Sequence, residues 1–247
     1  MARRATTIAD ERKGGGPTLV LDAGNSLTGD RDPALKSAGA SSIEAMSLLG
    51  YDAVALGPAD LKLGPAILRS RIAEALFSVL SANAIDRRTG ELLAKPYVVQ
   101  DFKGHRVAII GLSAAGDTDK ITVRDPLAAL KAVLTELGSQ ADEIIVLSTA
   151  GTSINREIAD SIVGITAIVE GGAGASVKPW VSSRTGTPIF HADEASPGHA
   201  GRVLGIAKLA LNRDGTLANY RWQKVSLGPE IAEDASVATW VRTQVGG

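Results

Sequence analysis

The stretch Thr18-Leu19-Val20-Leu21-Asp22-Ala23-Gly24-Asn25-Ser26-Leu27-Thr28-Gly29 is an apolar run that ends in a turn of small residues bearing a carboxylate. Segments 51–60, 143–151 and 167–176 repeat this pattern. Short continuous runs of Val, Ile and Leu are typical of buried parallel strands, and ligands bind at the loops that follow such strands in open α/β sheets. We therefore expect the four loops to share one rim.

Composition limits the classes of partner. The chain has 26 basic and 27 acidic residues, a balance that predicts no surface for nucleic acid or anionic membrane. The absence of cysteine excludes disulfides, thiolate metal sites and cysteine nucleophiles. No apolar run reaches the ~20 residues of a membrane span, and residues 1–16 have no apolar signal-peptide core, so localisation stays open. The length favours a single domain over residues 1–247.

Helix and strand patterns alternate along most of the chain, which predicts an α/β fold. The expected helices cover 2–13, 41–49, 65–76, 126–137, 153–162 and 237–245. The expected strands before residue 180 cover 18–22, 52–56, 78–81, 95–102, 106–112, 143–148 and 167–170, with 95–112 forming a hairpin.

Several helix ends carry specific signals. Ser41 and Glu44 have the spacing of a capping box, and Gly50 stands where a left-handed residue ends that helix. Asp125 and Asp234 are predicted as N-caps of the fourth and last helices. The helix that Pro65 opens is expected to turn four apolar residues inward, namely Ile67, Leu68, Ile72 and Leu76.

The pattern changes after residue 187. Segments 188–192, 202–211 and 218–225 alternate apolar and polar residues, with a turn at 212–215, and this predicts antiparallel sheet. Tyr220 and Trp222 fall on one face of the last strand. Together with Trp180 they are expected either to pack in the core or to form an exposed patch for a partner.

These landmarks, in this order, resemble the N-terminal metallophosphoesterase (calcineurin-like) domain of the bacterial 5'-nucleotidase family. The matching segments include Leu19-Val20-Leu21-Asp22-Ala23-Gly24, Leu49-Gly50-Tyr51-Asp52-Ala53-Val54, Ser81-Ala82-Asn83, Lys95-Pro96-Tyr97 and Ile145-Val146-Leu147-Ser148. The resemblance implies a four-layer α/β/β/α sandwich with mixed sheets. It also implies that the family's first strand lies upstream of this sequence and that its C-terminal specificity domain is not included.

Family members bind two metal ions at the strand ends and cleave phosphoesters with metal-activated water. The positions of their ligands carry other residues here. The bridging Asp corresponds to Asn25, and the Asn-His-Glu motif to Pro58, Ala59 and Asp60. The His that follows a Ser corresponds to Thr149, and the Gly-His-x-His pair to Gly172 and Gly174.

The replaced ligands lead us to expect no metal cofactor and a catalytically inactive protein that acts as an accessory or structural subunit through protein contacts. The resemblance to the family implies a location outside the cytoplasm. One alternative is a metal-dependent 5'-nucleotidase-type phosphohydrolase with a divalent metal pair. Another is a small-ligand binder that uses the vacated cleft. Asp22, Asn25 and Asp60 could hold one hard cation, or could serve as turn residues and a helix cap.

Other candidate residues lack a complete constellation. His105, His191 and His199 are too far apart in sequence to form a local ligand pair, and each is expected to have a structural or surface role. Segment 170–176 is rich in glycine but lacks the Gly-Lys-Ser/Thr ending of a phosphate loop. Ser148 and Ser153 have no adjacent histidine to activate them, so a hydrolase triad is not predicted.

Overall fold

The structure is a computed structural model that describes residues 1–28, 33–102, 104–172, 178–192 and 201–245. Its helices are α1 (Ala2–Lys13), α2 (Ala40–Leu48), α3 (Pro58–Leu61), α4 (Gly64–Glu74), α5 (Pro126–Leu137), α6 (Thr152–Ser161) and α7 (Ala235–Val245). Its strands are β1 (Leu21–Asp22), β2 (Ala53–Ala55), β3 (Ser78–Leu80), β4 (Ala84–Asp86), β5 (Tyr97–Phe102), β6 (His105–Leu112), β7 (Ile121–Val123), β8 (Glu143–Ser148), β9 (Ala167–Glu170), β10 (Trp180–Val181), β11 (Pro188–Phe190), β12 (Val203–Leu211) and β13 (Leu217–Ser226).

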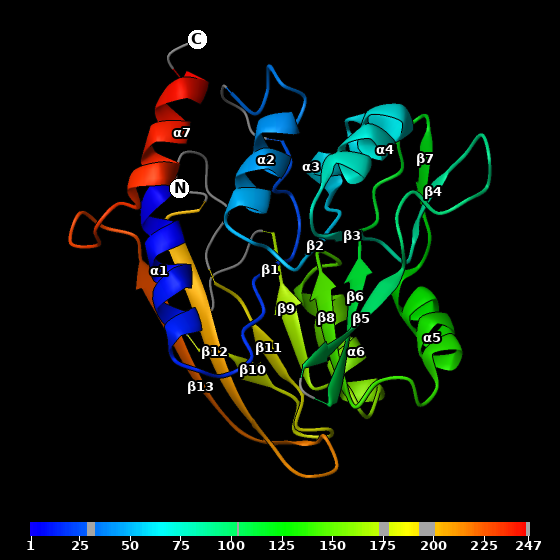
Figure 1. Cartoon of the computed structure of the whole chain (residues 1–247). Helices are drawn as coiled ribbons and strands as arrows, with labels where there is room; N and C mark the ends of the chain where they lie inside the picture. Colours follow the sequence, from blue (N-terminus) through cyan, green and yellow to red (C-terminus); the bar gives the residue numbers. More distant parts are fainter. Residues whose placement is uncertain (29–32, 103, 173–177, 193–200, 246–247) are drawn as a thin grey trace.

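Two main sheets organise the molecule (Figure 1). The smaller sheet has the order β1-β2-β3 and is parallel throughout. The larger has the order β10-β11-β9-β8-β6-β5, with a parallel centre of β11, β9, β8 and β6 and an antiparallel strand at each edge. All the parallel strands therefore end in loops that can meet on one side of the molecule.

The sheets and helices stack in four layers. Ala53 and Leu80 of the small sheet pack against Ile109 and Leu147 of the large sheet in one buried cluster. Helices α2, α3 and α4 cover the other face of the small sheet, and α5 and α6 cover the other face of the large one. The predicted α/β/β/α sandwich is confirmed.

The β12–β13 hairpin forms a separate two-stranded sheet. It packs on the large sheet through Phe190, whose ring stacks on Trp222 at 5.0 Å and meets Tyr220 edge-on at 5.3 Å. Tyr220 and Trp222 thus contribute to packing, while Trp180 lies under the guanidinium of Arg156 at 5.3 Å. Helices α1 and α7, from opposite ends of the chain, meet near their first residues (Figure 1), where the N–H of Asp234 donates to the Ala2 carbonyl at 3.3 Å.

Three of the predicted helix caps are confirmed. Asp125 accepts from the N–H of Ala128 at 2.7 Å, and Asp234 accepts from the N–H of Val237 at 2.9 Å. Gly50 has a φ of 67°, the left-handed conformation that terminates α2. In each of these caps the interacting residues are only a few positions apart in the sequence, so the local sequence is enough to predict the cap.

The capping box at Ser41 is wrong. Gly39, with a φ of 87°, is the N-cap of α2, so Ser41 lies inside the helix and its N–H donates to the Ser37 hydroxyl at 3.1 Å. The prediction for Leu76 is also wrong, because this side chain lies past the end of α4 and is 85% exposed. The prediction for Ile67 is wrong too, because its side chain is exposed, whereas Leu68 is fully buried as predicted.

The antiparallel assignment of 188–192 is wrong as well. β11 pairs in parallel with β9, through Ile189 opposite Ile168, and only its other neighbour β10 is antiparallel. The three apolar residues of β11 are all buried, which is the pattern of a parallel strand covered on both faces. β1 is an edge strand of its sheet, and the expectation of a strand beyond it stays a prediction.

Candidate functional site

Four loops meet at one rim, at the carboxyl ends of β1, β2, β8 and β9. A Cβ added to Gly24 would lie 2.9 Å from the Thr149 Cγ2 and 3.0 Å from the Gly57 N. A Cβ added to Gly171 would lie 3.0 Å from the Ala23 Cβ. The shared rim predicted from the four repeated patterns is therefore present, and its loops touch one another so closely that the glycines have no room for side chains.

Asp60 clamps the loops after β1 and β2. Its side chain is 0% exposed, and Oδ2 accepts from the N–H groups of Asn25 and Gly57, each at 2.8 Å. Oδ1 accepts from the N–H of Leu27 at 2.9 Å. In return, the Asn25 Oδ1 accepts from the N–H of Ala59 at 2.8 Å. Asn25 has a φ of 62°, a left-handed conformation that Asn tolerates better than most residues.

Burial controls the ionisation of the clamp. Loss of solvent raises the pKa of Asp60 to about 6, although the three N–H groups act in the opposite direction. The nearby Asp22 contributes the smallest part of this shift, since two carboxylates disfavour each other's charge. Asp60 therefore holds its proton more tightly than an exposed aspartate does.

The remaining ligand positions supply few free donor atoms. Pro58 and Ala59 form the first turn of α3, and Gly172 has a φ of 98° with nothing within 4 Å of an added Cβ. The Thr149 hydroxyl oxygen accepts from the N–H of Ala114 at 2.9 Å. Gly174 lies outside the described residues. Within the described ranges, no group of three or more His, Cys, Asp or Glu side chains is placed to hold a metal ion.

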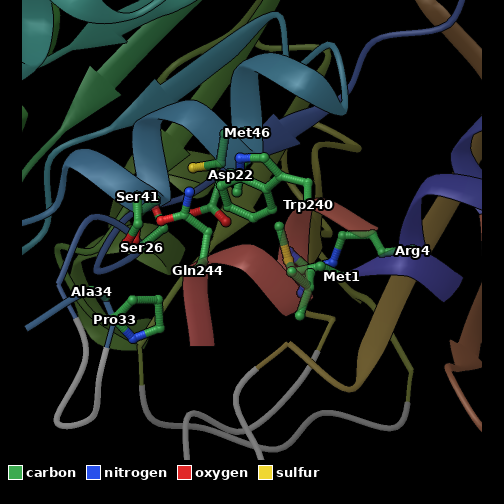
Figure 2. A pocket seen from close by; sticks show the side chains of 13 residues that line it. Met1, Arg4, Asp22, Ser26, Pro33, Ala34, Ser41, Met46, Trp240 and Gln244 are labelled. Carbon is green, nitrogen blue, oxygen red and sulfur yellow. The ribbon is translucent and has the colours of Figure 1, made fainter. Parts of the chain in front are cut away.

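A pocket of about 220 Å³ opens beside the rim (Figure 2). Asp22 and Ser26 line it from β1 and the following loop, and the Asp22 Oδ1 accepts from the N–H of Gly24 at 2.9 Å. Burial raises the pKa of Asp22, and the Gly24 N–H and the Arg4 charge oppose that shift. The other walls come from α1, α2, α7 and residues 33–34.

Sequence reasoning missed most of this pocket. Arg4 and Trp240 reach it from opposite ends of the chain because α1 packs beside α7. Neither residue belongs to a motif, and no local signal in the sequence marks them. Only the Asp22 side of the pocket could be predicted, from the carboxylate that follows the first apolar run.

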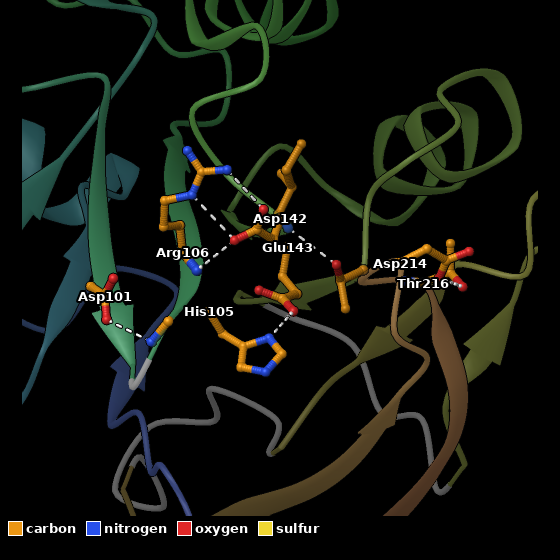
Figure 3. Close-up of polar contacts among 10 residues, drawn as sticks. Asp101, His105, Arg106, Asp142, Glu143, Asp214 and Thr216 are labelled. Atoms are coloured by element: carbon orange, nitrogen blue, oxygen red, sulfur yellow. Dashed lines mark hydrogen bonds and ion pairs between the residues drawn. The ribbon is translucent and has the colours of Figure 1, made fainter.

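One of the three histidines, His105, lies far from the rim. His105 begins β6, at the opposite end of the large sheet, where its Nδ1 lies 3.2 Å from the Glu143 Oε1 (Figure 3). His191 is buried directly after β11, and His199 lies outside the described residues. Glu170 ends β9 at the rim, and its Oε1 accepts from the Thr152 hydroxyl at 2.5 Å.

Of the two serines considered as nucleophiles, one is hydrogen-bonded inside the protein and the other lies in a helix. The Ser148 hydroxyl donates to the Asn155 Oδ1 at 2.6 Å inside the protein, and Ser153 lies in the first turn of α6. Within the described part of the chain, no helix is long and apolar enough to cross a membrane.

Comparisons with known proteins identify relatives among nucleotidases. The chain is 36% identical over 172 residues to a 5'-nucleotidase of Vibrio cholerae, a match that covers 64% of this chain and 31% of that protein. It is 30% identical over 191 residues to Protein UshA of Escherichia coli, covering 73% of this chain and 34% of UshA. The chain thus spans about a third of the length of these curated relatives. No family model matches it.

Solved structures agree with this relationship. The 5'-nucleotidase precursor of Thermus thermophilus aligns over 99% of this chain and 52% of its own, with a TM-score of 0.84 and 25% identity. The calcineurin-like phosphoesterase YfkN of Bacillus subtilis aligns over 99% of this chain and 87% of its own, with a TM-score of 0.79 and 21% identity. The second likeness concerns the fold alone.

Proposed function

We propose that this chain, a calcineurin-like metallophosphoesterase domain related to the N-terminal part of bacterial 5'-nucleotidases, is catalytically inactive and acts as an accessory or structural subunit through protein contacts. One observation carries the proposal. At three of the positions that correspond to the family's metal ligands, Asn25, Asp60 and Thr149, side-chain oxygens accept hydrogen bonds from main-chain N–H groups, so these residues hold the loops of the rim together.

The side-chain oxygens at these positions are already engaged in hydrogen bonds, which supports the proposal that they hold no metal ion. The Asp60 carboxylate accepts hydrogen bonds from three main-chain N–H groups, and the Asn25 side-chain oxygen accepts one. The Thr149 hydroxyl oxygen accepts one from the N–H of Ala114. A metal ion bound to Asp60 would compete with those N–H groups and would open the clamp. The residues present therefore do not fit a two-metal centre.

Electrostatics supports the same conclusion. Two divalent cations ~4 Å apart repel by roughly 16 kcal/mol even at an effective dielectric of 20, and bridging carboxylates normally offset that energy. The bridging position carries the uncharged Asn25.

A surface for protein contacts is available on the helical layer over the small sheet. Leu48 at the end of α2 is 54% exposed, and Leu76 is 85% exposed. The two segments adjoin, since the N–H of Leu76 donates to the Ser47 hydroxyl at 3.4 Å. Large exposed apolar side chains that lie together are typical of interaction surfaces.

Metal content and hydrolysis test the proposal directly. The purified chain is incubated with Mn²⁺ or Zn²⁺, passed through a desalting column and assayed for bound metal and for hydrolysis of AMP with and without EDTA. We expect substoichiometric metal and no EDTA-sensitive hydrolysis. Two metal ions per chain with EDTA-sensitive hydrolysis would favour the alternative, a working phosphohydrolase.

The contact surface is tested by substitution. Leu48→Lys together with Leu76→Lys is expected to abolish co-purification of partner proteins from the native source. Val163→Lys is the matched control, because Val163 is equally exposed at 85% but lies near the end of α6. Equal loss with the control, or no loss with the double variant, contradicts this surface.

A further inference from the structure

The pocket beside β1 is built from five separate segments that meet only in the folded protein. Met1 and Arg4 come from the start of the chain, Asp22 and Ser26 from β1 and its loop, and further walls from residues 33–34, α2 and α7. Its volume is about 220 Å³, below the ~300–1,000 Å³ of pockets that hold drug-sized ligands. A ligand that fills it would be a small molecule.

Asp22 is the polar group with capacity to spare. Its Oδ1 accepts from the N–H of Gly24, and among the described residues no Lys or Arg side chain lies within ion-pairing distance of its carboxylate. The Ser26 hydroxyl lies within reach of this carboxylate and lowers its pKa, against the larger effect of burial. A carboxylate that has lost water without gaining full compensation favours any ligand that brings an N–H donor.

The positive group on the opposite side is already occupied. The Arg4 Nη1 donates to the Tyr51 hydroxyl at 3.1 Å, and the Arg4 Nη2 donates to the Gly201 carbonyl at 2.8 Å. These two nitrogens are engaged, the Arg4 Nε is buried without a hydrogen-bond partner among the described residues, and the charge of the guanidinium repels a cation. With Asp22 repelling anions in turn, the walls disfavour net charge of either sign.

The rest of the wall is apolar, and its largest member is held in place. The indole N–H of Trp240 donates to the Glu44 Oε1 at 2.7 Å, which fixes the ring against α2. Met46 from α2, Val241 from α7 and Ala34 complete this side. A flat ring can pack against an indole with little loss of conformational entropy.

We propose that this pocket binds a small uncharged molecule that presents an N–H donor to Asp22 and packs a flat apolar ring against Trp240. The pocket lies beside the clamp and uses none of the Asp60 or Asn25 atoms. The proposal is independent of whether the protein hydrolyses phosphoesters, so either can fail without the other.

Three matched probes test the chemistry. Benzamide is uncharged and carries N–H donors, methyl benzoate has the same ring without a donor, and benzamidine carries the donors on a cation. The indole N–H signal of Trp240 in a ¹H–¹⁵N spectrum, assigned with Trp240→Phe, reports binding. We expect benzamide to shift this signal saturably at millimolar concentration. Methyl benzoate should bind about tenfold more weakly, the size of one hydrogen bond to a charged group. Benzamidine should also bind more weakly than benzamide, because the Arg4 guanidinium repels its charge.

Asp22→Asn tests the donor contact, with Asp52→Asn as the matched control. Asp52 also adjoins β1, where its carboxylate accepts from the N–H of Val20 at 2.7 Å, but it does not line the pocket. Benzamide affinity should fall about tenfold in Asp22→Asn and stay unchanged in Asp52→Asn. No shift with benzamide, or equal binding of methyl benzoate to the unsubstituted protein, overturns the proposal even if Asp22→Asn does not fold.

Discussion

The two ends of the sheets hold two aspartates in opposite ways. At the rim, Asp60 is buried, bonds to three backbone N–H groups and has its pKa raised to about 6 by loss of solvent. At the far end, Asp142 is exposed and accepts from the guanidinium and N–H of Arg106, which lower its pKa to about 2 (Figure 3). One carboxylate organises the main chain, and the other belongs to a surface ion pair.

This difference means that the fold depends on the Asp60 carboxylate more than on the Asp142 carboxylate. The N–H groups around Asp60 come from two loops and have no water to replace the carboxylate, so its removal leaves several buried donors unpaired. The partners of Asp142 can turn to solvent. A polar cluster at a presumed ligand position can therefore be more important for folding than one on the surface.

The largest expected effect is that of Asp60→Ala. Three buried N–H groups lose their acceptor, and we expect the free energy of unfolding at pH 7 to fall by about 4 kcal/mol. Urea denaturation measures it. If Asp60→Ala changes the urea midpoint no more than Asp142→Ala does, the contrast between the two ends is wrong.

The next effect is pH dependence. The pKa of Asp60 is raised from 3.8 to about 6, so the folded state binds this proton more tightly than the unfolded chain does. The stability gained from this group is complete below pH ~4 and is lost as the pH rises to ~6, by about 3 kcal/mol. Asp142, whose pKa is lowered, has the opposite sign, and its contribution is lost as the pH falls from 3.8 toward 2.

Two measurements separate these carboxylates. The ¹³C signal of the Asp60 carboxyl should titrate near pH 6 and that of Asp142 near pH 2. The difference in unfolding free energy between the unsubstituted chain and Asp60→Asn should change between pH 4 and 6.5. Titration of Asp60 below pH 4 would remove the basis of this prediction.

A smaller effect tests the tight contact of the rim loops. Gly24→Ala places a Cβ 2.9 Å from the Thr149 Cγ2, whereas Gly172→Ala meets nothing within 4 Å, and both glycines have positive φ. Both variants place a non-glycine residue at a positive φ, which costs stability. The difference between their unfolding free energies therefore measures the clash of the added Cβ. We expect Gly24→Ala to cost about 2 kcal/mol more, and Thr149→Ser to recover part of that cost. Equal costs would mean that the loops can separate freely.

The smallest expected effect is at the far end. Asp142→Ala and Arg106→Ala each remove one partner of an exposed ion pair. The urea midpoint of either variant should stay within the range of ordinary surface substitutions. A shift as large as that of Asp60→Ala would show that the hairpin turn at Gly215, which packs on the Asp142 carbonyl, depends on this pair.

Local signals explain which parts of the fold could be predicted. Asp125 and Asp234 cap helices through atoms three residues away, and the apolar runs of β2, β8 and β9 are buried whatever surrounds them. The prediction of a capping box at Ser41 was wrong because Gly39 adopts a left-handed conformation and acts as the N-cap of α2 instead. The prediction that Leu76 turns inward was wrong because α4 ends at Glu74, so the helical period does not reach Leu76.

The site was predictable only in part for a similar reason. The rim follows from four strand–loop patterns, each local. The clamp does not, because Asp60 bonds to Asn25 and Leu27 from a loop more than thirty residues earlier. The pocket depends on Arg4 and Trp240, which only the packing of α1 against α7 brings together.

β1 and β8 both lead to the rim, but they are paired very differently. β1 pairs through Leu21 and Asp22 with β2, its one partner among the described strands, while β8 is flanked by β6 and β9. Amide hydrogens of 21–27 should therefore exchange with deuterium through local opening, long before those of 144–147, which await global unfolding. The Asp60 clamp joins the loop after this edge strand to the loop after β2, so it limits how often this corner of the molecule opens locally.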